Sequence, residues 1–330
     1  MKILVTGAEG FIGSHLVERL VKSNHKVKAF VLYNSFNSLG WLDTLDKKIK
    51  KKIDFIVGDI RDENSIKESI KGCDVVINLA ALIGIPYSYK SPRSYYDTNV
   101  IGTLNILQAS KDLKVKKIIH TSTSEVYGTP IYTPIDERHP INSQSPYASS
   151  KVAADQLAIS FYKSYNLPVT ILRPFNTYGP RQSARAVIPT IITQILSGKK
   201  FVKLGNIETT RDLTYIDDTI SGFINSITRK NDGEEINLGT GFDYSIKYLV
   251  NIISKILSVD VKIILDKKRV RPKKSEVLKL QSKNLKARKL LNWKPKYINK
   301  NGLALGLKRT IEWFANSENI KNYKSDKYNI

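Results

Sequence analysis

The sequence predicts an α/β fold in which a parallel sheet carries helices on both faces. Two observations support this prediction. Short apolar runs alternate with segments of helical spacing through the first half of the chain, a pattern typical of strand–helix–strand units with right-handed crossovers. The first apolar run, residues 3–5, enters a glycine-rich turn at residues 7–13 that leads into a helical segment at residues 14–20. Together they predict a Rossmann-type, doubly wound sheet.

The glycine-rich turn predicts a dinucleotide site. It reads G-A-E-G-F-I-G, so its glycines follow the spacing G-x-x-G-x-x-G and not the commoner G-x-G-x-x-G. Such glycines let the backbone approach a pyrophosphate, whose charge is stabilised by a helix N-terminus. The alternative is a glycine turn that holds no ligand. The cofactor contacts predicted here are Gly7, Gly10, Phe11, Ile12 and Gly13.

Three further strands are predicted at residues 26–32, 53–57 and 75–79. In NAD-binding proteins the second strand usually ends in an acidic residue that accepts the ribose hydroxyls. Here it ends in Val31-Leu32-Tyr33-Asn34, and no arginine stands there for a 2′-phosphate. These residues therefore do not settle NAD against NADP; NAD is the expected cofactor, with NADP left open. Further cofactor contacts are predicted after the third and fourth strands, at Asp59, Ile60, Leu79, Ala80 and Ala81.

The stretch from residue 119 to residue 151 carries the predicted chemistry. Tyr147 and Lys151 stand four residues apart in a helix predicted at residues 146–165, so their side chains share one face. A lysine beside a tyrosine favours the phenolate, which can remove a proton from a hydroxyl group. Thr123-Ser124-Glu125 follows an isoleucine-rich strand, so we expect it where that strand enters a cleft. The alternative for Tyr147 and Lys151 is an ordinary surface helix.

The second half of the chain predicts a smaller α/β lobe. Strands are predicted at residues 169–172, 203–205, 210–215, 235–238 and 261–265, and helices within 92–112 and at 186–196, 217–227, 244–257 and 303–314. No linker or repeat separates the halves, so the lobes are expected to interleave. The predicted cofactor lobe is 1–178 plus 214–238, the substrate lobe is 179–213 plus 239–314, and 315–330 form a loose polar tail.

Composition excludes several classes of protein. The net charge of +23 over 330 residues fits either a binder of nucleic acid or membrane surfaces, or a lysine-rich composition with an anionic substrate. The basic runs lack interleaved aromatic residues and no nucleic-acid motif is present, which favours the second interpretation. Cys73 is the single cysteine and is expected to be a buried, inert thiol. The four histidines lack metal-ligand spacing, so no metal is expected, and no apolar run is long enough for a membrane helix. A cytoplasmic location is expected.

With these pieces in order, the chain resembles the extended short-chain dehydrogenase/reductase family. The resemblance covers all but the tail, and its motifs are the glycine turn, Asp59-Ile60, Asn78-Leu79-Ala80-Ala81, Tyr147/Lys151 and Arg173-Pro174-Phe175-Asn176. It implies that Pro174 also contacts the cofactor.

Thr123-Ser124-Glu125 resembles the Thr-(Ser or Asp)-Glu triplet of nucleotide-sugar 4,6-dehydratases, of which the epimerases of the family lack the glutamate. This resemblance implies that Tyr147, with Lys151 and Thr123, is the base at C4 of the sugar. It also implies that Glu125 removes the proton at C5, and that Glu125 or Ser124 protonates the hydroxyl leaving C6.

Residues 33–38, 81–89 and 179–189 are similar to dehydratases of the legionaminic acid pathway, which implies a GDP- or UDP-linked N-acetylglucosamine substrate. Arg271-Pro272, Ser275-Glu276 and Leu291-Asn292-Trp293-Lys294-Pro295 resemble GDP-mannose dehydratases. The substrate candidates are Asn176, Arg211 and Arg271 for the diphosphate, Glu276 for the nucleotide ribose, and Arg185 within the third segment.

Other functions stay open at this point. A UDP-glucuronate decarboxylase can also carry Thr-Ser-Glu, a C4 epimerase would not need Glu125, and an NAD(P)-sensing or nucleic-acid-binding module would keep the fold without turnover. The family resemblance further implies a homodimer built on the helices near residues 100–110 and 152–162.

Overall fold

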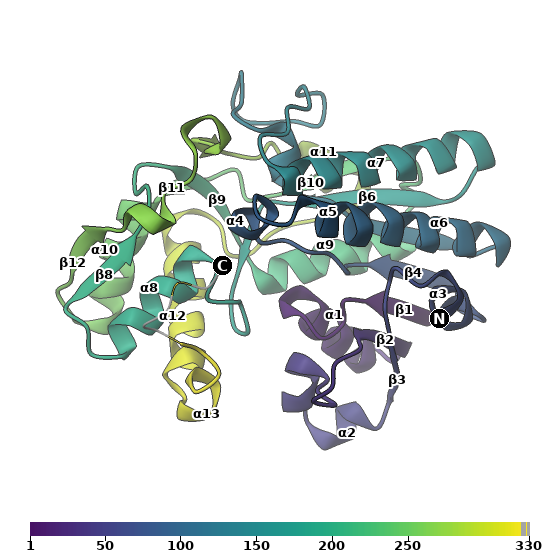
Figure 1. The fold of residues 1–330 in the computed structure, drawn as a ribbon, viewed down its shortest axis with the longest axis horizontal. Coiled ribbons are helices and arrows are strands. Elements are labelled where there is room, and N and C mark those ends of the chain that lie inside the picture. Colours follow the sequence, from purple (N-terminus) through teal and green to yellow (C-terminus); the bar gives the residue numbers. More distant parts are fainter. Residues whose placement is uncertain (325–327, 329–330) are drawn as a thin grey trace.

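The computed structural model describes residues 1–324 and 328, and its main sheet has seven parallel strands (Figure 1). Their order is β3-β2-β1-β4-β5-β6-β10. The strands are β1 (Lys2–Thr6), β2 (Lys26–Leu32), β3 (Ile53–Gly58), β4 (Val75–Asn78), β5 (Lys117–Thr121), β6 (Val169–Pro174) and β10 (Glu235–Leu238). The order reverses between β1 and β4, and such a reversal opens a crevice at the carboxyl ends of the strands. The predicted doubly wound sheet is confirmed.

Helices cover both faces of this sheet (Figure 1). On one face α1 (Phe11–Lys22) packs against α9 (Ile216–Thr228), and on the other α6 (Gly102–Asp112) packs between α3 (Glu63–Ile70) and α7 (Pro146–Tyr165). Successive side chains of β1 point to opposite faces of the sheet, so that Ile3 belongs to one core cluster and Leu4 to the other. A strand that is buried on both faces must be apolar throughout, which is why it reads as a continuous apolar run.

A smaller lobe lies beyond the carboxyl ends of β6 and β10 (Figure 1). Its first sheet pairs β9 (Thr210–Tyr215) with β7 (Asn176–Tyr178), β11 (Asp243–Ser245) and β13 (Lys279–Leu280), and its second pairs β8 (Phe201–Leu204) with β12 (Lys262–Leu265). Its helices are α8 (Val187–Leu196), α10 (Ile246–Leu257) and α12 (Asn299–Ala315), whereas α11 (Leu285–Leu291) packs against β10 and α9 of the main sheet. The strands β7, β11 and β13 were not predicted, because a segment of two or three residues is too short to show a periodicity of apolar side chains.

The division into two lobes by residue range stays a prediction. Its boundary between residues 213 and 214 falls inside β9. The helix predicted within residues 92–112 is present in three pieces, α5 (Pro92–Tyr95), a π-helical turn at Tyr96–Ile101 and α6. The remaining short elements are α2 (Lys47–Lys50), α4 (Ile85–Ser88), α13 (Ser317–Ile320) and the 3-10 turns Gly40–Thr44, Ser124–Tyr127, Lys267–Arg269 and Lys273–Ser275.

The prediction of a loose tail is wrong for residues 316–323. The Asn316 side chain accepts the Glu318 N–H and caps α13. The Tyr323 ring stacks on Trp41, with 6.0 Å between ring centroids, and its hydroxyl donates to the Gln182 carbonyl at 2.9 Å. The polar composition of the segment concealed Tyr323, a large aromatic side chain for which the fold provides a site. Residues 325–327 and 329–330 of the predicted tail lie outside the described part of the chain.

Candidate active site

A cleft of about 1290 Å³ lies between the main sheet and the smaller lobe. Its lining combines the glycine turn, the ends of β3 and β4, the first turn of α7 and residues from β9 to Glu276. Every predicted site residue except Ser124 belongs to this lining. The fold therefore brings together segments from both halves of the chain, although the roles predicted for them remain predictions.

The glycine turn has the geometry that a pyrophosphate requires. Gly7 adopts φ +62°, and a Cβ there would come within 2.8 Å of the Ala80 backbone nitrogen. A Cβ on Gly13 would come within 2.1 Å of the Gly7 carbonyl oxygen, so α1 can approach β1 only because Gly13 has no side chain. Helix α1 begins after Gly10 with no side-chain cap and no acidic residue in its first turn. Its first N–H groups are available to an anion, so these residues fit the diphosphate of NAD.

The end of the cleft next to β3 holds Asp59, which was predicted to contact the cofactor. Its carboxylate is already engaged, because Arg61 Nε donates to it at 2.9 Å. This hydrogen bond is the main reason that the pKa of Asp59 is lowered. Asp59 and Arg61 thus present a nearly neutral pair at this end of the cleft.

Tyr147 and Lys151 enter the cleft from the beginning of α7. Ser145 caps this helix by accepting the Ala148 N–H at 3.1 Å, and Pro146 occupies its first position. Both Tyr147 and Lys151 are buried, and Lys151 Nζ donates to the Thr121 carbonyl at 2.6 Å. The cap and the one-turn spacing hold the two side chains on the face that looks into the cleft.

In the unliganded site, burial opposes the Tyr147 phenolate that Lys151 was predicted to favour. Burial raises the pKa of Tyr147, and the neighbouring Thr123 hydroxyl offsets only part of this effect. Burial also lowers the pKa of Lys151 to about 8, which the Asp155 carboxylate partly counteracts. The sequence argument considered the attraction between the two groups but not the loss of water around each of them.

The 3-10 turn Ser124–Tyr127 carries Glu125 to the cleft and takes Ser124 away from it. Thr123 caps this turn by accepting the Glu125 N–H at 3.2 Å. Glu125 lines the cleft, close enough for its charge to act on Tyr147 and on Arg211. Ser124 is buried and is not part of the lining, so the prediction that it protonates a leaving group is corrected. Adjacent residues in such a turn point in different directions.

The smaller lobe contributes a cluster of charged side chains. Glu276 Oε1 lies 3.5 Å from a guanidinium nitrogen of Arg211 and 3.5 Å from one of Arg271. Arg271 Nη1 and Asn176 Oδ1 are buried and have no hydrogen-bond partner among the described residues. Donors and acceptors that are buried without partners are costly, so this cluster is suited to bind a polar, anionic ligand.

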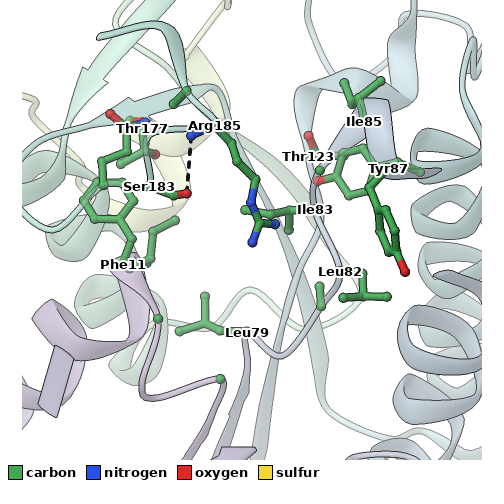
Figure 2. Close-up of a pocket in the computed structure, with 18 of the residues that line it drawn as sticks. Phe11, Leu79, Leu82, Ile83, Ile85, Tyr87, Thr123, Thr177, Ser183 and Arg185 are labelled. Carbon is green, nitrogen blue, oxygen red and sulfur yellow. Dashed lines mark hydrogen bonds between the residues drawn. The ribbon is translucent and has the colours of Figure 1, made fainter. Parts of the chain in front are cut away.

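Arg185 also reaches into the cleft. Figure 2 shows its guanidinium projecting between Thr177 on one wall and Ile83 on the other. Only its backbone N–H makes a hydrogen bond in the described part of the chain, to Ser183 Oγ at 3.4 Å. Its charged end therefore faces the open cleft, beside the loop that carries Ile83 and Tyr87 (Figure 2).

A buried polar network below Lys151 was not predicted from sequence. Asp155 accepts from Ser122 Oγ at 2.6 Å and from Arg173 Nη2 at 3.1 Å, and His120 Nε2 lies 3.3 Å from its other oxygen. Arg173 also bonds Tyr127 Oη at 3.0 Å. Asp155 lies one helical turn after Lys151, and this spacing could have indicated from the sequence that the two side chains share a face of the helix.

In the part of the chain that the structure describes, no group of three or more His, Cys, Asp or Glu side chains could hold a metal ion. Among the same residues, no helix combines the length and the apolar character needed to cross a membrane. The lone cysteine, Cys73, is half-buried, and burial raises the pKa of its thiol. A thiol with a raised pKa is a poor nucleophile at neutral pH.

Comparisons with known proteins agree with this architecture. Residues 4–305 match the protein family described as "GDP-mannose 4,6 dehydratase". A putative UDP-glucose 4-epimerase of Methanocaldococcus jannaschii is 35% identical over 96% of this chain and 99% of its own length. Human dTDP-D-glucose 4,6-dehydratase is 33% identical over 98% of this chain and 92% of its own length.

Solved structures share the fold. A double mutant of dTDP-glucose 4,6-dehydratase from Streptomyces venezuelae, crystallised with NAD, superposes with a TM-score of 0.86 at 29% identity and covers 96% of this chain and 98% of its own. A tyrosine-to-phenylalanine mutant of UDP-glucuronic acid 4-epimerase from Bacillus cereus, also crystallised with NAD, superposes with a TM-score of 0.85 at 31% identity and covers 95% of this chain and 98% of its own. Dehydratases and epimerases thus share one scaffold, and side chains in the cleft must distinguish them.

Proposed function

The chain belongs to the GDP-mannose 4,6 dehydratase family, the extended short-chain dehydrogenases/reductases that act on nucleotide sugars, and from this premise we propose that it is a nucleotide-sugar 4,6-dehydratase that uses NAD. The observation that carries the proposal is the position of Glu125. An ionisable carboxyl group lines the cleft beside Tyr147, in addition to the residues that oxidation at C4 needs. Removal of water requires a second acid/base group of this kind.

In the proposed reaction, the Tyr147 phenolate, which the Lys151 ammonium stabilises, accepts the proton of the C4 hydroxyl and becomes a neutral phenol. Bound NAD supplies reversible hydride transfer, from C4 at the start of a turnover and back to C6 at its end. Glu125 removes the C5 proton, which the C4 ketone has made acidic, and passes a proton to the hydroxyl that leaves C6 as water. C5 regains a proton as hydride returns to C6, which balances the proton that Tyr147 took from the C4 hydroxyl. Ser124 has no part in this step because it is buried away from the cleft.

We further propose that the substrate is an N-acetylglucosamine linked to GDP or UDP, used in the synthesis of a surface glycan such as legionaminic acid. Support comes from the resemblance of residues 33–38, 81–89 and 179–189 to dehydratases of that pathway. Asn176, Arg211 and Arg271 would bind the diphosphate and Glu276 a ribose hydroxyl, which fits their convergence on one part of the cleft.

The test incubates the purified protein separately with GDP-GlcNAc, UDP-GlcNAc, GDP-mannose, dTDP-glucose and UDP-glucuronate and measures product masses, without added NADH. The expected result is loss of one water from an N-acetylglucosamine nucleotide, with catalytic turnover because the cofactor is regenerated. Loss of water from GDP-mannose or dTDP-glucose alone would keep the dehydratase and reject the proposed sugar. Loss of carbon dioxide from UDP-glucuronate would identify a decarboxylase instead.

The Glu125→Gln variant tests the step itself. We expect it to oxidise C4, so that NADH absorbance appears, while loss of water falls by at least about a hundredfold. Glu312→Gln, an exposed carboxylate on α12, is the matched control and should turn over normally. Normal dehydration by Glu125→Gln would reject the assignment.

A C4 epimerase is the second candidate, because the relative from Methanocaldococcus jannaschii carries that description. An epimerase leaves the mass unchanged and converts UDP-glucose into UDP-galactose. Chromatography of an incubation with UDP-glucose or UDP-GlcNAc detects this outcome directly.

A further inference from the structure

Glu9, in the turn between β1 and α1, is an acidic residue that the proposed chemistry does not use. Its Oε1 accepts the backbone N–H of Leu32 at 3.1 Å. Its Oε2 is buried and has no hydrogen-bond partner among the described residues. Burial raises the pKa of this carboxyl group. A buried carboxylate oxygen without a donor is unfavourable, so a ligand donor is the natural partner for it.

The position of Glu9 relates it to the cofactor half of the cleft. It lines the cleft together with the glycines on either side of it, Gly7 and Gly10. Because β1 pairs in parallel with β2, the turn that follows β1 lies beside the carboxyl end of β2, where Leu32 is the last residue. That end is where NAD-binding sheets usually place an acidic side chain, and this chain has none in Leu32-Tyr33-Asn34.

The loop at residues 38–41 holds Glu9 in place. Trp41 donates its backbone N–H to the Glu9 carbonyl at 3.0 Å. A Cβ on Gly40 would approach the Glu9 Cβ to 2.9 Å, so the loop packs directly on this side chain. Glu9 is therefore a fixed acceptor and not a freely rotating surface carboxylate.

The charges around Glu9 oppose an additional phosphate. Asp43 and Asp59 line the same end of the cleft as Glu9. The neighbouring cation, Arg61, is held by Asp59, with Nε donating at 2.9 Å to one oxygen and at 3.1 Å to the other. A 2′-phosphate would thus meet the Glu9 carboxylate with no free guanidinium beside it among the described residues of this end.

We propose that Glu9 replaces the acidic residue missing from the end of β2: its free oxygen accepts hydrogen bonds from the adenosine ribose hydroxyls and makes this chain select NAD over NADP. The inference rests on the proposed use of a nicotinamide cofactor, but not on the identity of the sugar. It assigns cofactor selection to a side chain inside the glycine turn.

Titration calorimetry of NAD⁺ and of NADP⁺ into the purified full-length protein, without sugar nucleotide, tests the proposal. We expect the unaltered protein to bind NAD⁺ at least about tenfold more tightly than NADP⁺. Glu9→Gln keeps an oxygen that can accept the Leu32 N–H but removes the charge. It should weaken NAD⁺ binding about tenfold and reduce the preference over NADP⁺ by a similar factor.

Glu63→Gln, which removes an exposed negative charge on α3 outside the cleft, is the matched control and should leave both affinities unchanged. Thermal unfolding of each variant separates the two roles that Glu9 can have. A lower Tm for Glu9→Gln with an unchanged NAD⁺/NADP⁺ ratio would mean that Glu9 only supports the loop, and would overturn the proposal. A preference of the unaltered protein for NADP⁺ would overturn it as well.

These outcomes are independent of the dehydratase assignment. Should no sugar nucleotide lose water while Glu9→Gln still loses its preference for NAD⁺, the dehydratase proposal fails and the role of Glu9 stands. Should dehydration occur while Glu9→Gln keeps the preference, the role of Glu9 fails alone.

Discussion

Removal from water decides how the residues at the beginning of α7 ionise. Tyr147 and Lys151 are both buried, and burial shifts the pKa of each in the direction that favours its neutral form. Tyr147 is therefore favoured as a neutral phenol in the unliganded site. Lys151 keeps its positive charge only up to a moderately alkaline pH. A base with this arrangement works over a limited pH range.

The first prediction concerns the alkaline limit of activity. Because the pKa of Lys151 is lowered to about 8, the charge that stabilises the Tyr147 phenolate is lost as the pH rises through that value. We expect kcat for dehydration to decline above about pH 8. Initial rates from about pH 6 to about pH 10 measure this. A rate that stays constant through this range would contradict the assigned role of Lys151.

The second prediction concerns stability in acid. Burial lowers the pKa of His15 to about 4, from an ordinary value of 6.5. Between these two pH values His15 binds a proton in the unfolded chain but not in the folded chain. The free energy of unfolding therefore falls as the pH decreases from about 6.5 to about 4. The contribution of His15 to this loss is at most about 3 kcal/mol.

Urea unfolding at several pH values measures the effect. His15→Gln keeps an amide that can donate to the Pro180 carbonyl, which His15 Nε2 approaches at 3.0 Å, but it does not titrate. The fall in stability should therefore be smaller in His15→Gln than in the comparison variant His25→Gln. An identical fall in both variants would rule out His15 as its cause.

At the scale of elements, the catalytic geometry depends on how helices begin. Helix α1 begins at a turn with no side-chain cap, which leaves its N-terminus available to a ligand, whereas α7 begins with a Ser145 cap and Pro146. The first arrangement binds an anion and the second holds side chains firmly in place. The two helix starts thus serve different purposes in one cleft.

The third prediction tests the contact between β1 and α1. Gly13→Ala would place a methyl group 2.1 Å from the Gly7 carbonyl oxygen and 2.8 Å from Ala8 Cα, both backbone atoms that cannot rotate away. We expect a loss of about 3 kcal/mol or more in the free energy of unfolding, together with loss of NAD binding. The control is Gly10→Ala, whose Cβ comes no closer than 3.3 Å to the Gly7 oxygen. Equal stability of the two variants would contradict the argument.

At the scale of the whole molecule, the two lobes are joined by more than the crossing strands. Trp41, which follows β2, packs against Trp313 of α12 at 5.4 Å and against Tyr323 at 6.0 Å between ring centroids. The segment after α12 thus connects the smaller lobe to the cofactor half. The cleft is enclosed by contacts between residues from the two ends of the sequence.

The fourth prediction concerns assembly. Helices α6 and α7 pack side by side, and Ile101, just before α6, is 44% exposed. We expect these helices to form a dimer interface, with a mass by light scattering of twice 37.3 kDa. Ile101→Asp should shift the protein toward the monomer, whereas Ile131→Asp, at a 76% exposed site outside these helices, should not. A monomeric mass for the unaltered protein would reject the interface.

The sequence by itself determined the local structure of the chain. The strand Lys26–Leu32 and the helix Pro146–Tyr165 were predicted with the bounds that the structure has, because apolar periodicity and the helix start at Pro146 are read over a few neighbouring residues. Nearly all of the predicted site residues line the cleft, since the glycine turn and the carboxyl ends of parallel strands must meet at one edge of the sheet.

Only the tertiary structure decided which charges meet and which groups lose water. It brought Arg211, Arg271 and Glu276 together, turned Ser124 inward and left one oxygen of Glu9 without a partner among the described residues. It also raised the pKa of Tyr147, against the expectation from sequence. The physical reason is common to all of these: burial and long-range electrostatics depend on neighbours that are distant in sequence, and local patterns carry no information about them.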